Sequence, residues 1–198
     1  PSSFDACDRL ATRVNSLSLV RYRNNDYSVP VAFGHQEVWI RGYVHEVIIG
    51  CASEEIARHP RSYDREDYIF NPIHYLPLLE KKIGALDQAA PLEGWDLPNV
   101  FATLRRLLEA RMGKPGKREY VQVLRLLETF ELNDLHGAIK DALRLSAISC
   151  DAIKHLVLCR IERLPPRLNL DIYPYLPRAQ VATTSAASYM NLLADGAS

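Results

Sequence analysis

The basic segment Gly113-Lys-Pro-Gly-Lys-Arg118 has the residue types of a phosphate-binding loop but not its spacing. A Walker-type loop needs four residues between its glycines and a Ser or Thr after the lysine, which together hold a nucleotide and its metal. Here two residues separate the glycines, and Arg118 follows the lysine. We therefore do not expect a phosphate-binding ATPase.

The same Gly-x-x-Gly spacing occurs in the KH nucleic-acid clamp. That fold needs strands after its helices, whereas this chain continues with further helical patterns. Two interpretations remain open for the segment. It is either a solvated basic turn between helices or a contact with a nucleic-acid backbone through Lys114, Lys117 and Arg118.

Metal-ligating and nucleophilic residue types are scattered along the chain. His155 and Cys159 have the spacing of two ligands on one helix face, but no second pair accompanies them. Asp96 and Glu131 are separated much like a polynucleotidyl-transferase acidic pair, but no strand-borne Asp precedes them. There is no Gly-x-Ser-x-Gly motif. We expect no catalytic constellation, no metal and no cofactor in this chain.

Basic and polar side chains in the first third of the chain are candidates for contact with DNA. They are Arg21, Arg23, Asn24, Asn25, Tyr27, Arg41, His59 and Arg61. The first five surround one predicted hairpin, and His59 and Arg61, two residues apart on a predicted strand, share a face. Such side chains position proteins on a phosphate backbone. The alternative, which stays open, is a solvated rim with Tyr27 in the core.

The elements that carry these residues change type near residue 63. Alternating patterns at residues 16–23 and 27–33, a long apolar run at 38–51 that holds one or two strands, and a last segment at 56–61 predict four or five strands, with an Asn-Asn-Asp turn after the first. Pro30 places the second strand at an edge or bend, because proline cannot donate to a β-ladder. So many tightly connected strands favour a small, SH3-like closed barrel.

Helical periodicity follows. A short helix is predicted over residues 72–82, a packed loop over 84–97, and longer helices over 98–112 and 115–130. Asn133 and Ser149 are the predicted N-caps of two more. The short connections favour an antiparallel helical bundle. After Pro165-Pro166 the chain reads as an extended tail with a short helix from Thr184, whose apolar residues are candidates for partner binding: Tyr189, Met190, Leu192 and Leu193.

Composition is that of an ordinary globular protein. The 198 residues are 47% hydrophobic and 24% charged, with 24 basic and 24 acidic side chains. Charge is nonetheless segregated, since residues 102–125 hold seven basic and two acidic side chains. Four isolated cysteines and the lack of a signal or membrane-spanning segment favour a cytoplasmic protein with reduced thiols. Because the chain begins with Pro1, we expect a piece of a longer protein.

Particular segments resemble a known family. Val20-Arg-Tyr-Arg-Asn-Asn-Asp-Tyr-Ser-Val-Pro30 and Ile56-Ala-Arg-His-Pro-Arg61 resemble the Mu-type transposase C-terminal β-barrel. His74-Tyr-Leu-Pro-Leu-Leu-Glu80, Arg118-Glu-Tyr-Val-Gln-Val-Leu-Arg125 and Tyr173-Pro-Tyr-Leu-Pro177 are similar to the bacterial IstA-type insertion-sequence transposases in particular. The resemblance extends from about residue 14 to 193.

The resemblance implies a function in DNA transposition, integration and recombination. In that family a helix-turn-helix region and a ribonuclease-H-like domain, whose Asp, Asp, Glu triad binds Mg²⁺, precede the barrel. Neither is expected here, so the chain corresponds to the non-catalytic part. The implied partners are double-stranded DNA at transposon ends, other transposase subunits and an IstB-type AAA+ ATPase docking on the tail. The implied location is the bacterial cytoplasm, at the nucleoid.

We therefore predict an α+β fold in four parts: a linker at residues 1–13, a β-barrel at 14–63, a helical domain at 64–164, and an extended tail at 165–198 with a terminal helix. The predicted function is binding of the DNA backbone at transposon ends and assembly of the paired-end complex. The alternative is a protein–protein assembly module that touches DNA little.

Overall fold

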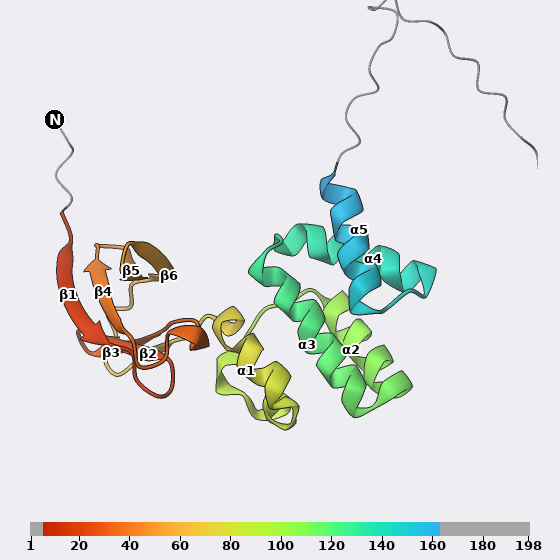
Figure 1. The fold of residues 1–198 in the computed structure, drawn as a ribbon, viewed down its shortest axis with the longest axis horizontal. Helices are drawn as coiled ribbons and strands as arrows, with labels where there is room; N and C mark the ends of the chain where they lie inside the picture. Colours follow the sequence, from red (N-terminus) through yellow and green to blue (C-terminus); the bar gives the residue numbers. More distant parts are fainter. Residues whose placement is uncertain (1–5, 163–198) are drawn as a thin grey trace, which may run out of the picture. The chain divides into compact units, whose positions relative to one another are not determined.

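The computed structural model describes residues 6–162, in which two β-sheets are followed by a helical region (Figure 1). This α+β organisation confirms the predicted fold class. The predicted tail lies outside the described residues, and with it Tyr189, Met190, Leu192 and Leu193.

The first sheet is antiparallel and four-stranded. Its order is β1 (Asp8–Arg13), β4 (Glu37–Gly42), β5 (Glu46–Cys51) and β6 (Glu54–Pro60). β1 pairs with β4 over its whole length, from Asp8 opposite Gly42 to Arg13 opposite Glu37. The prediction of a linker up to residue 13 is therefore wrong from Asp8 onward. The strand escaped detection because its side chains are almost all exposed, which removes the apolar alternation of a half-buried strand.

The second sheet is built from β2 (Leu19–Tyr22), β3 (Asn25–Ser28) and the two-residue β7 (Tyr68–Ile69), which pairs parallel to β3. The predicted strand at residues 27–33 is shorter than expected. It ends at Ser28, and a 3₁₀ turn over Val31–Phe33 follows Pro30. This agrees with the inability of proline to continue a ladder.

One hydrophobic core is shared by the two sheets. Val20 and Tyr27 from the second sheet and Ile40 and Ile49 from the first are all at most 1% exposed within it. Burying a side chain of this size stabilises a fold by roughly 1.5–3 kcal/mol, so this shared core holds the sheets face to face. Closure of the strands into a barrel stays a prediction.

The helical region contains five α-helices among the described residues. They are α1 (Leu76–Lys81), α2 (Asn99–Met112), α3 (Lys114–Arg125), α4 (Leu132–Leu145) and α5 (Cys150–Ile161). Short 3₁₀ turns occupy Pro72–Tyr75, Ile83–Gln88, Ala90–Leu92 and Leu126–Glu128. The predicted helix at residues 115–130 thus ends earlier, at Arg125, and the predicted loop at 84–97 consists largely of 3₁₀ turns.

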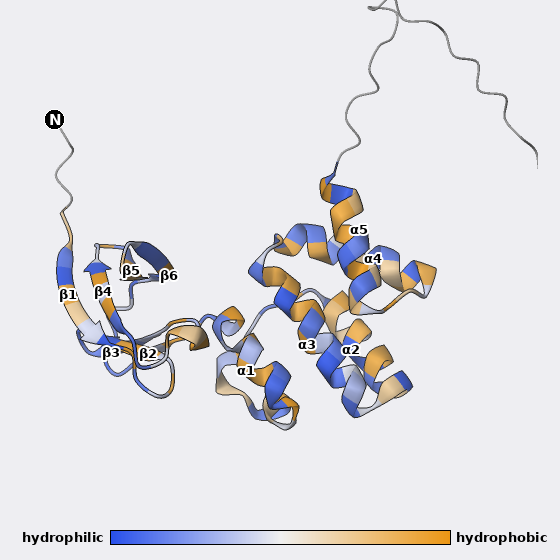
Figure 2. Cartoon of the chain, viewed as in Figure 1, coloured by the Kyte–Doolittle hydropathy of each residue, from blue (hydrophilic) through white to orange (hydrophobic). Residues whose placement is uncertain are grey.

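A second hydrophobic core lies among these helices. Phe101, Leu104 and Leu108 of α2 pack in it with residues of α3, α4 and α5, all nearly inaccessible to solvent. Each of α2 to α5 also carries hydrophilic residues, as expected for helices with one buried side (Figure 2). The helical part therefore has its own packed interior.

The two predicted helix caps have different outcomes. The Ser149 hydroxyl accepts a hydrogen bond from the Ala152 N–H at 3.2 Å, which confirms the N-cap of α5. Asn133 is not a cap, because α4 begins at Leu132 and Glu131 occupies the N-cap position, two residues earlier than predicted. The sequence could not distinguish these two starts.

The segment after β7 is tied to the sheets by three hydrogen bonds. The Ser28 hydroxyl accepts a hydrogen bond from the Asn71 N–H at 2.8 Å and forms a second one with the His74 Nδ1 at 2.9 Å. The Tyr75 hydroxyl donates a hydrogen bond to the Leu17 carbonyl at 3.1 Å. By their contacts, the described residues 6–162 form one unit. The division into two domains after residue 63 stays a prediction.

Candidate nucleic-acid interface

A small polar pocket lies where the β2–β3 turn meets the end of β6. It measures about 100 Å³. Its lining residues are Tyr22, Arg23, Asn24, Asn25, Arg61, Ser62, Tyr63 and Asp64. We call this group the tip site. Two parts of the predicted DNA-binding set that are distant in the sequence, the hairpin and Arg61, are thus brought together.

Arg61 is held in a fixed orientation at the tip site. Its Nη1 donates to the Tyr43 carbonyl at 2.7 Å, and its guanidinium lies 4.7 Å from the ring centre of Tyr63 and 5.5 Å from that of Tyr22. No carboxylate among the described residues pairs with it. Cation–π contacts favour the charged group without neutralising it, so Arg61 keeps its positive charge for a ligand.

Arg23 is more exposed and partly neutralised. It adopts a positive φ of 57°, which is uncommon for a residue with a Cβ. Its Nη2 donates to the Asp8 carboxylate at 2.7 Å, and Asp8 also accepts from the Tyr22 hydroxyl at 3.2 Å. The Tyr22 hydroxyl, and then Asp8, raise the pKa of the Arg23 guanidinium. A phosphate would therefore have to compete with Asp8 for this side chain.

Arg21 and Asn24 are exposed and loosely held. The Arg21 guanidinium contacts the Asp26 carboxylate at 3.5 Å and the Asn24 carbonyl at 3.4 Å, both long distances. An ion pair of this length on a side chain 58% exposed contributes little to stability. Both residues remain available to a ligand.

Three predicted contact residues are buried, and the structure removes them from the set. Asn25 donates to the Ser62 carbonyl at 3.0 Å, the Tyr27 hydroxyl accepts the Ser62 N–H at 3.1 Å, and the His59 Nε2 donates to the Ser28 carbonyl at 2.6 Å. Their exposed fractions are 2%, 1% and 3%. Their polar atoms hold the backbone in place and cannot reach DNA.

The shared face of His59 and Arg61 stays a prediction. His59 is buried on β6, whereas Arg61 lies one residue beyond the end of that strand, Pro60, and lines the tip site. Arg41, on β4, lies outside the tip site, with its guanidinium 4.6 Å above the Trp39 ring.

The second basic segment, residues 113–118, is not a loop. Gly113 alone separates α2 from α3, and Lys114 is already helical. Gly116 is buried against α2, where any Cβ would collide with the Leu108 carbonyl. The interpretation as a basic turn is therefore wrong, because the second glycine is needed for close packing of two helices.

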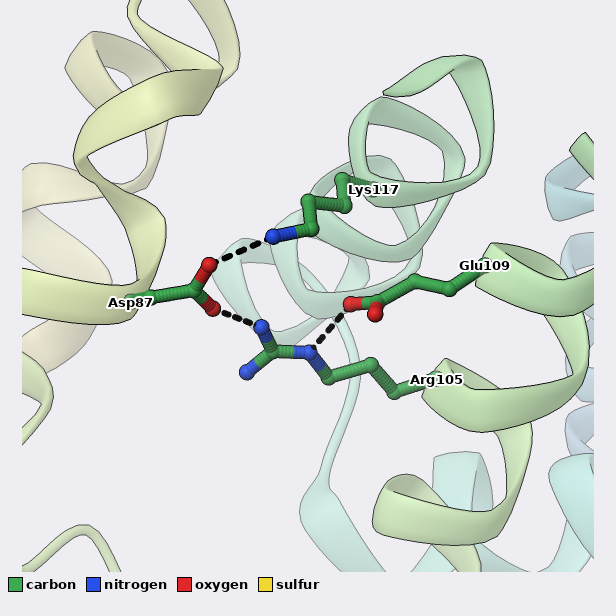
Figure 3. Close-up of polar contacts among 4 residues, drawn as sticks. All are labelled: Asp87, Arg105, Glu109 and Lys117. Atoms are coloured by element: carbon green, nitrogen blue, oxygen red, sulfur yellow. Dashed lines mark hydrogen bonds and ion pairs between the residues drawn. The ribbon is translucent and has the colours of Figure 1, made fainter. Parts of the chain in front are cut away.

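Lys117 is also engaged within the protein. Its Nζ forms an ion pair with the Asp87 carboxylate at 2.5 Å. The same carboxylate accepts a hydrogen bond from the Arg105 guanidinium, which also donates to the Glu109 carboxylate at 2.7 Å (Figure 3). Lys117 and then Arg105 lower the pKa of the Asp87 carboxyl. Asp87 thus neutralises one unit of the excess charge of residues 102–125, while Glu109 belongs to that range itself. Lys114 and Arg118 remain exposed.

The comparisons with known proteins agree with the resemblance found in the sequence. Residues 1–71 match the family described as Mu transposase, C-terminal domain. These residues belong to that family. The Mu transposase C-terminal domain thus includes both sheets and the whole tip site, and it ends just before the 3₁₀ turn at Pro72–Tyr75.

Similarity to transposases extends beyond the Mu transposase C-terminal domain. The transposases for insertion sequences IS1326/IS1353 of Pseudomonas aeruginosa and Shigella flexneri are each 31% identical over 172 residues, which cover 84% of this chain and 33% of theirs. A transposase of Aminobacter aminovorans is 32% identical over 209 residues, covering 92% of this chain and 39% of its own. The chain therefore spans little more than a third of these curated relatives. No solved structure matches it significantly.

Other chemistry is not assembled in the described part of the chain. No group of three or more His, Cys, Asp or Glu side chains there could hold a metal ion. The predicted single pair, His155 and Cys159, is exposed, with its Nε2 and Sγ atoms 3.5 Å apart. No helix within residues 6–162 has the length and apolar character needed to cross a membrane.

Proposed function

We propose that this chain is the C-terminal, non-catalytic region of an IstA-like DDE-type transposase. It binds the DNA backbone at transposon ends and helps to assemble the paired-end complex. The observation that carries the proposal is the tip site, where Arg23 and Asn24 of the β2–β3 turn converge with Arg61, which follows β6, within the Mu transposase C-terminal domain.

The chemistry of the tip site suits a phosphodiester. A guanidinium presents its donors in a planar fork that matches two phosphate oxygens. Arg61 is oriented by Tyr63 and by the Tyr43 carbonyl, so it loses little conformational freedom when it binds. Such contacts position a protein on DNA but do not read its sequence. Catalysis and its Mg²⁺ belong, in this proposal, to a part of the relatives that the chain does not span.

The test is a titration of the 198-residue chain with a duplex of its element's terminal sequence and with a scrambled duplex, across a salt series. Backbone binding predicts a steep fall of affinity with salt, similar for both duplexes, because bound cations displace counterions from phosphates. Lack of binding at low salt would overturn the proposal. A strong preference for the terminal sequence would show that base reading, which we assign elsewhere, takes place here.

An assembly module is the second candidate, and an apolar groove favours it. The groove measures about 430 Å³ and lies between the β2 segment and α1. Leu17, Tyr68 and Leu78 line it and are 66%, 57% and 40% exposed. Exposed apolar side chains gathered in one place often mark a contact with another protein. The partner would be a second transposase subunit or an AAA+ helper ATPase.

Replacing Arg21 and Arg23 by Glu separates the two candidates. The DNA-binding proposal predicts weaker DNA binding with unchanged oligomerisation, measured by light scattering. The assembly proposal predicts unchanged DNA affinity. Leu78→Glu is the reciprocal variant, since it places a charge in the groove without altering the tip site; the DNA-binding proposal predicts that its DNA affinity equals that of the wild type.

A further inference from the structure

The outer face of the first sheet carries a second arrangement of arginines. On β4, Ile40 and Val38 point into the core, so alternation places Arg41 and Trp39 on the opposite face. Across the β1–β4 ladder, Arg9 is directly opposite Arg41. The two arginines are therefore partners on the outer face of the sheet, where both line one hollow.

The Trp39 ring is fixed flat on this face. Its indole N–H donates to the Ala52 carbonyl at 2.8 Å. The ring lies against Gly50, its partner on β5, where a Cβ of any other residue would collide with the indole. The Arg41 guanidinium lies over the ring at 4.6 Å. Gly50, Trp39 and Ala52 thus act together to hold one cation in a defined position.

The charge of Arg41 is not balanced within the described part of the protein, where the guanidinium forms no ion pair. Arg58 lies on the same face but is neutralised. It is on β6, opposite Ile48 of β5, and Ile48 is in turn opposite Arg41 of β4. Arg58 is paired with Glu46 at 2.7 Å and with Glu55 at 2.9 Å. The unbalanced charge that an anion would meet on this face is therefore that of Arg41.

There is space for such an anion. A hollow of about 420 Å³ opens on this face, lined by Arg9, Trp39 and Arg41 together with the small residues Ala11 and Ala52. Trp39 is covered by Arg41, so its ring is not free to stack on a base. The hollow therefore suits a charged oxygen ligand and not a flat aromatic one.

We propose that Arg9 and Arg41 bind a phosphate of a nucleic-acid backbone, at a second site on the outer face of the first sheet. This inference rests on the proposed DNA-binding function and extends it. The two sites meet at the start of β1, since Asp8 holds Arg23 at the tip site and the next residue, Arg9, faces outward. A backbone that passes around this edge strand contacts both sites.

The test compares three variants of the full chain: Arg41→Gln, Arg58→Gln and Arg61→Gln. Binding to a duplex of arbitrary sequence is followed by fluorescence anisotropy across a salt series, and thermal unfolding checks that each variant is folded. Arg41→Gln is expected to weaken binding about tenfold at low salt, the cost of one charged hydrogen-bonding partner. It should also lower the slope of log Kd against log salt by about one. Arg58→Gln is the matched control, because it removes the same charge from the same face but from a neutralised position.

The outcomes separate the two proposals. Wild-type affinity and slope in Arg41→Gln, together with weaker binding in Arg61→Gln, would overturn the second site and leave the tip site standing. Equal losses in Arg41→Gln and Arg58→Gln would also overturn it, because net charge alone would then account for the effect. A wild-type chain that binds no duplex at low salt would overturn both proposals.

Discussion

His59 and His74 meet edge to face in the interior, with ring centres 5.6 Å apart and planes at 83°. His59 comes from β6 and His74 from the 3₁₀ turn that follows the sheets, and both contact Ser28. Both imidazoles are buried and both form hydrogen bonds with Ser28, so the loss of hydration disfavours the charged form of each. The contact between the sheets and the following segment is thus sensitive to acid.

The first prediction is a loss of stability on acidification. Burial, and then the neighbouring His59, lower the pKa of His74 to about 4, and burial also lowers the pKa of His59. In the unfolded chain both titrate near pH 6.5, so between about pH 6.5 and 4 the unfolded state binds more protons. The free energy of unfolding should therefore decrease as the pH is lowered through this window. For His74 alone the loss is up to about 3 kcal/mol.

Urea unfolding at a series of pH values measures this loss. His74→Asn should be less stable than the wild type at neutral pH but flatter in its pH dependence. His45→Asn, at an exposed position, is the control and should reproduce the wild-type curve. A His74→Asn variant with the full wild-type pH dependence would show that other groups cause the loss.

The second prediction concerns the α2–α3 contact. Gly116→Ala should lower the free energy of unfolding by about 2–4 kcal/mol, because the new Cβ collides with the Leu108 backbone, which cannot yield like a flexible side chain. Gly84→Ala, with nothing within 4 Å of the new Cβ, should change stability by less than about 1 kcal/mol. Urea denaturation measures both. Equal effects would contradict close packing at Gly116.

The third prediction concerns Asp8, whose carboxylate pairs with Arg23. Asp8→Asn removes the competing anion, so duplex affinity should rise about three- to tenfold and the salt slope should steepen by about one. Asp141→Asn removes a carboxylate that pairs with Arg144 and Arg160 instead, and should leave DNA binding unchanged. Weaker binding by Asp8→Asn would mean that Asp8 positions Arg23 for its ligand.

The fourth prediction distinguishes two lysines of the same helix. Lys114 is exposed, whereas Lys117 is paired with Asp87. If the helical region touches DNA, Lys114→Ala should lower the salt slope by about one and Lys117→Ala should not. Lys117→Ala should instead cost about 0.5 kcal/mol of stability, the usual worth of a partly exposed ion pair. A larger loss of DNA affinity in Lys117→Ala than in Lys114→Ala would contradict this assignment.

Local signals in the sequence predicted most of the regular structure. The apolar stripe of α2 and the Ser149 cap of α5 depend on residues within a turn or two of one another, so they can be identified from the sequence alone. The β2–β3 hairpin was predicted for the same reason, but its turn consists of Arg23 and Asn24 and not of residues 24–26, because Asn25 and Asp26 already pair within β3. The family resemblance, carried by runs such as Val20 to Pro30, is likewise a property of contiguous sequence.

Side-chain accessibility required the tertiary structure. Asn25, Tyr27 and His59 have the chemistry of DNA-binding residues, but the core between the sheets and the loop after β6 take up their polar groups. Lys117 is neutralised by Asp87, thirty residues away, through packing that no local pattern reveals.

The sequence by itself therefore determined the α+β class, most helices and the family, because periodicity, capping and motif identity are short-range. The tertiary structure decided which cations face solvent, how Arg61 reaches the hairpin, and why Gly116 cannot carry a side chain. Those properties depend on which distant segments pack together, and burial and ion pairing are set only when that packing is complete.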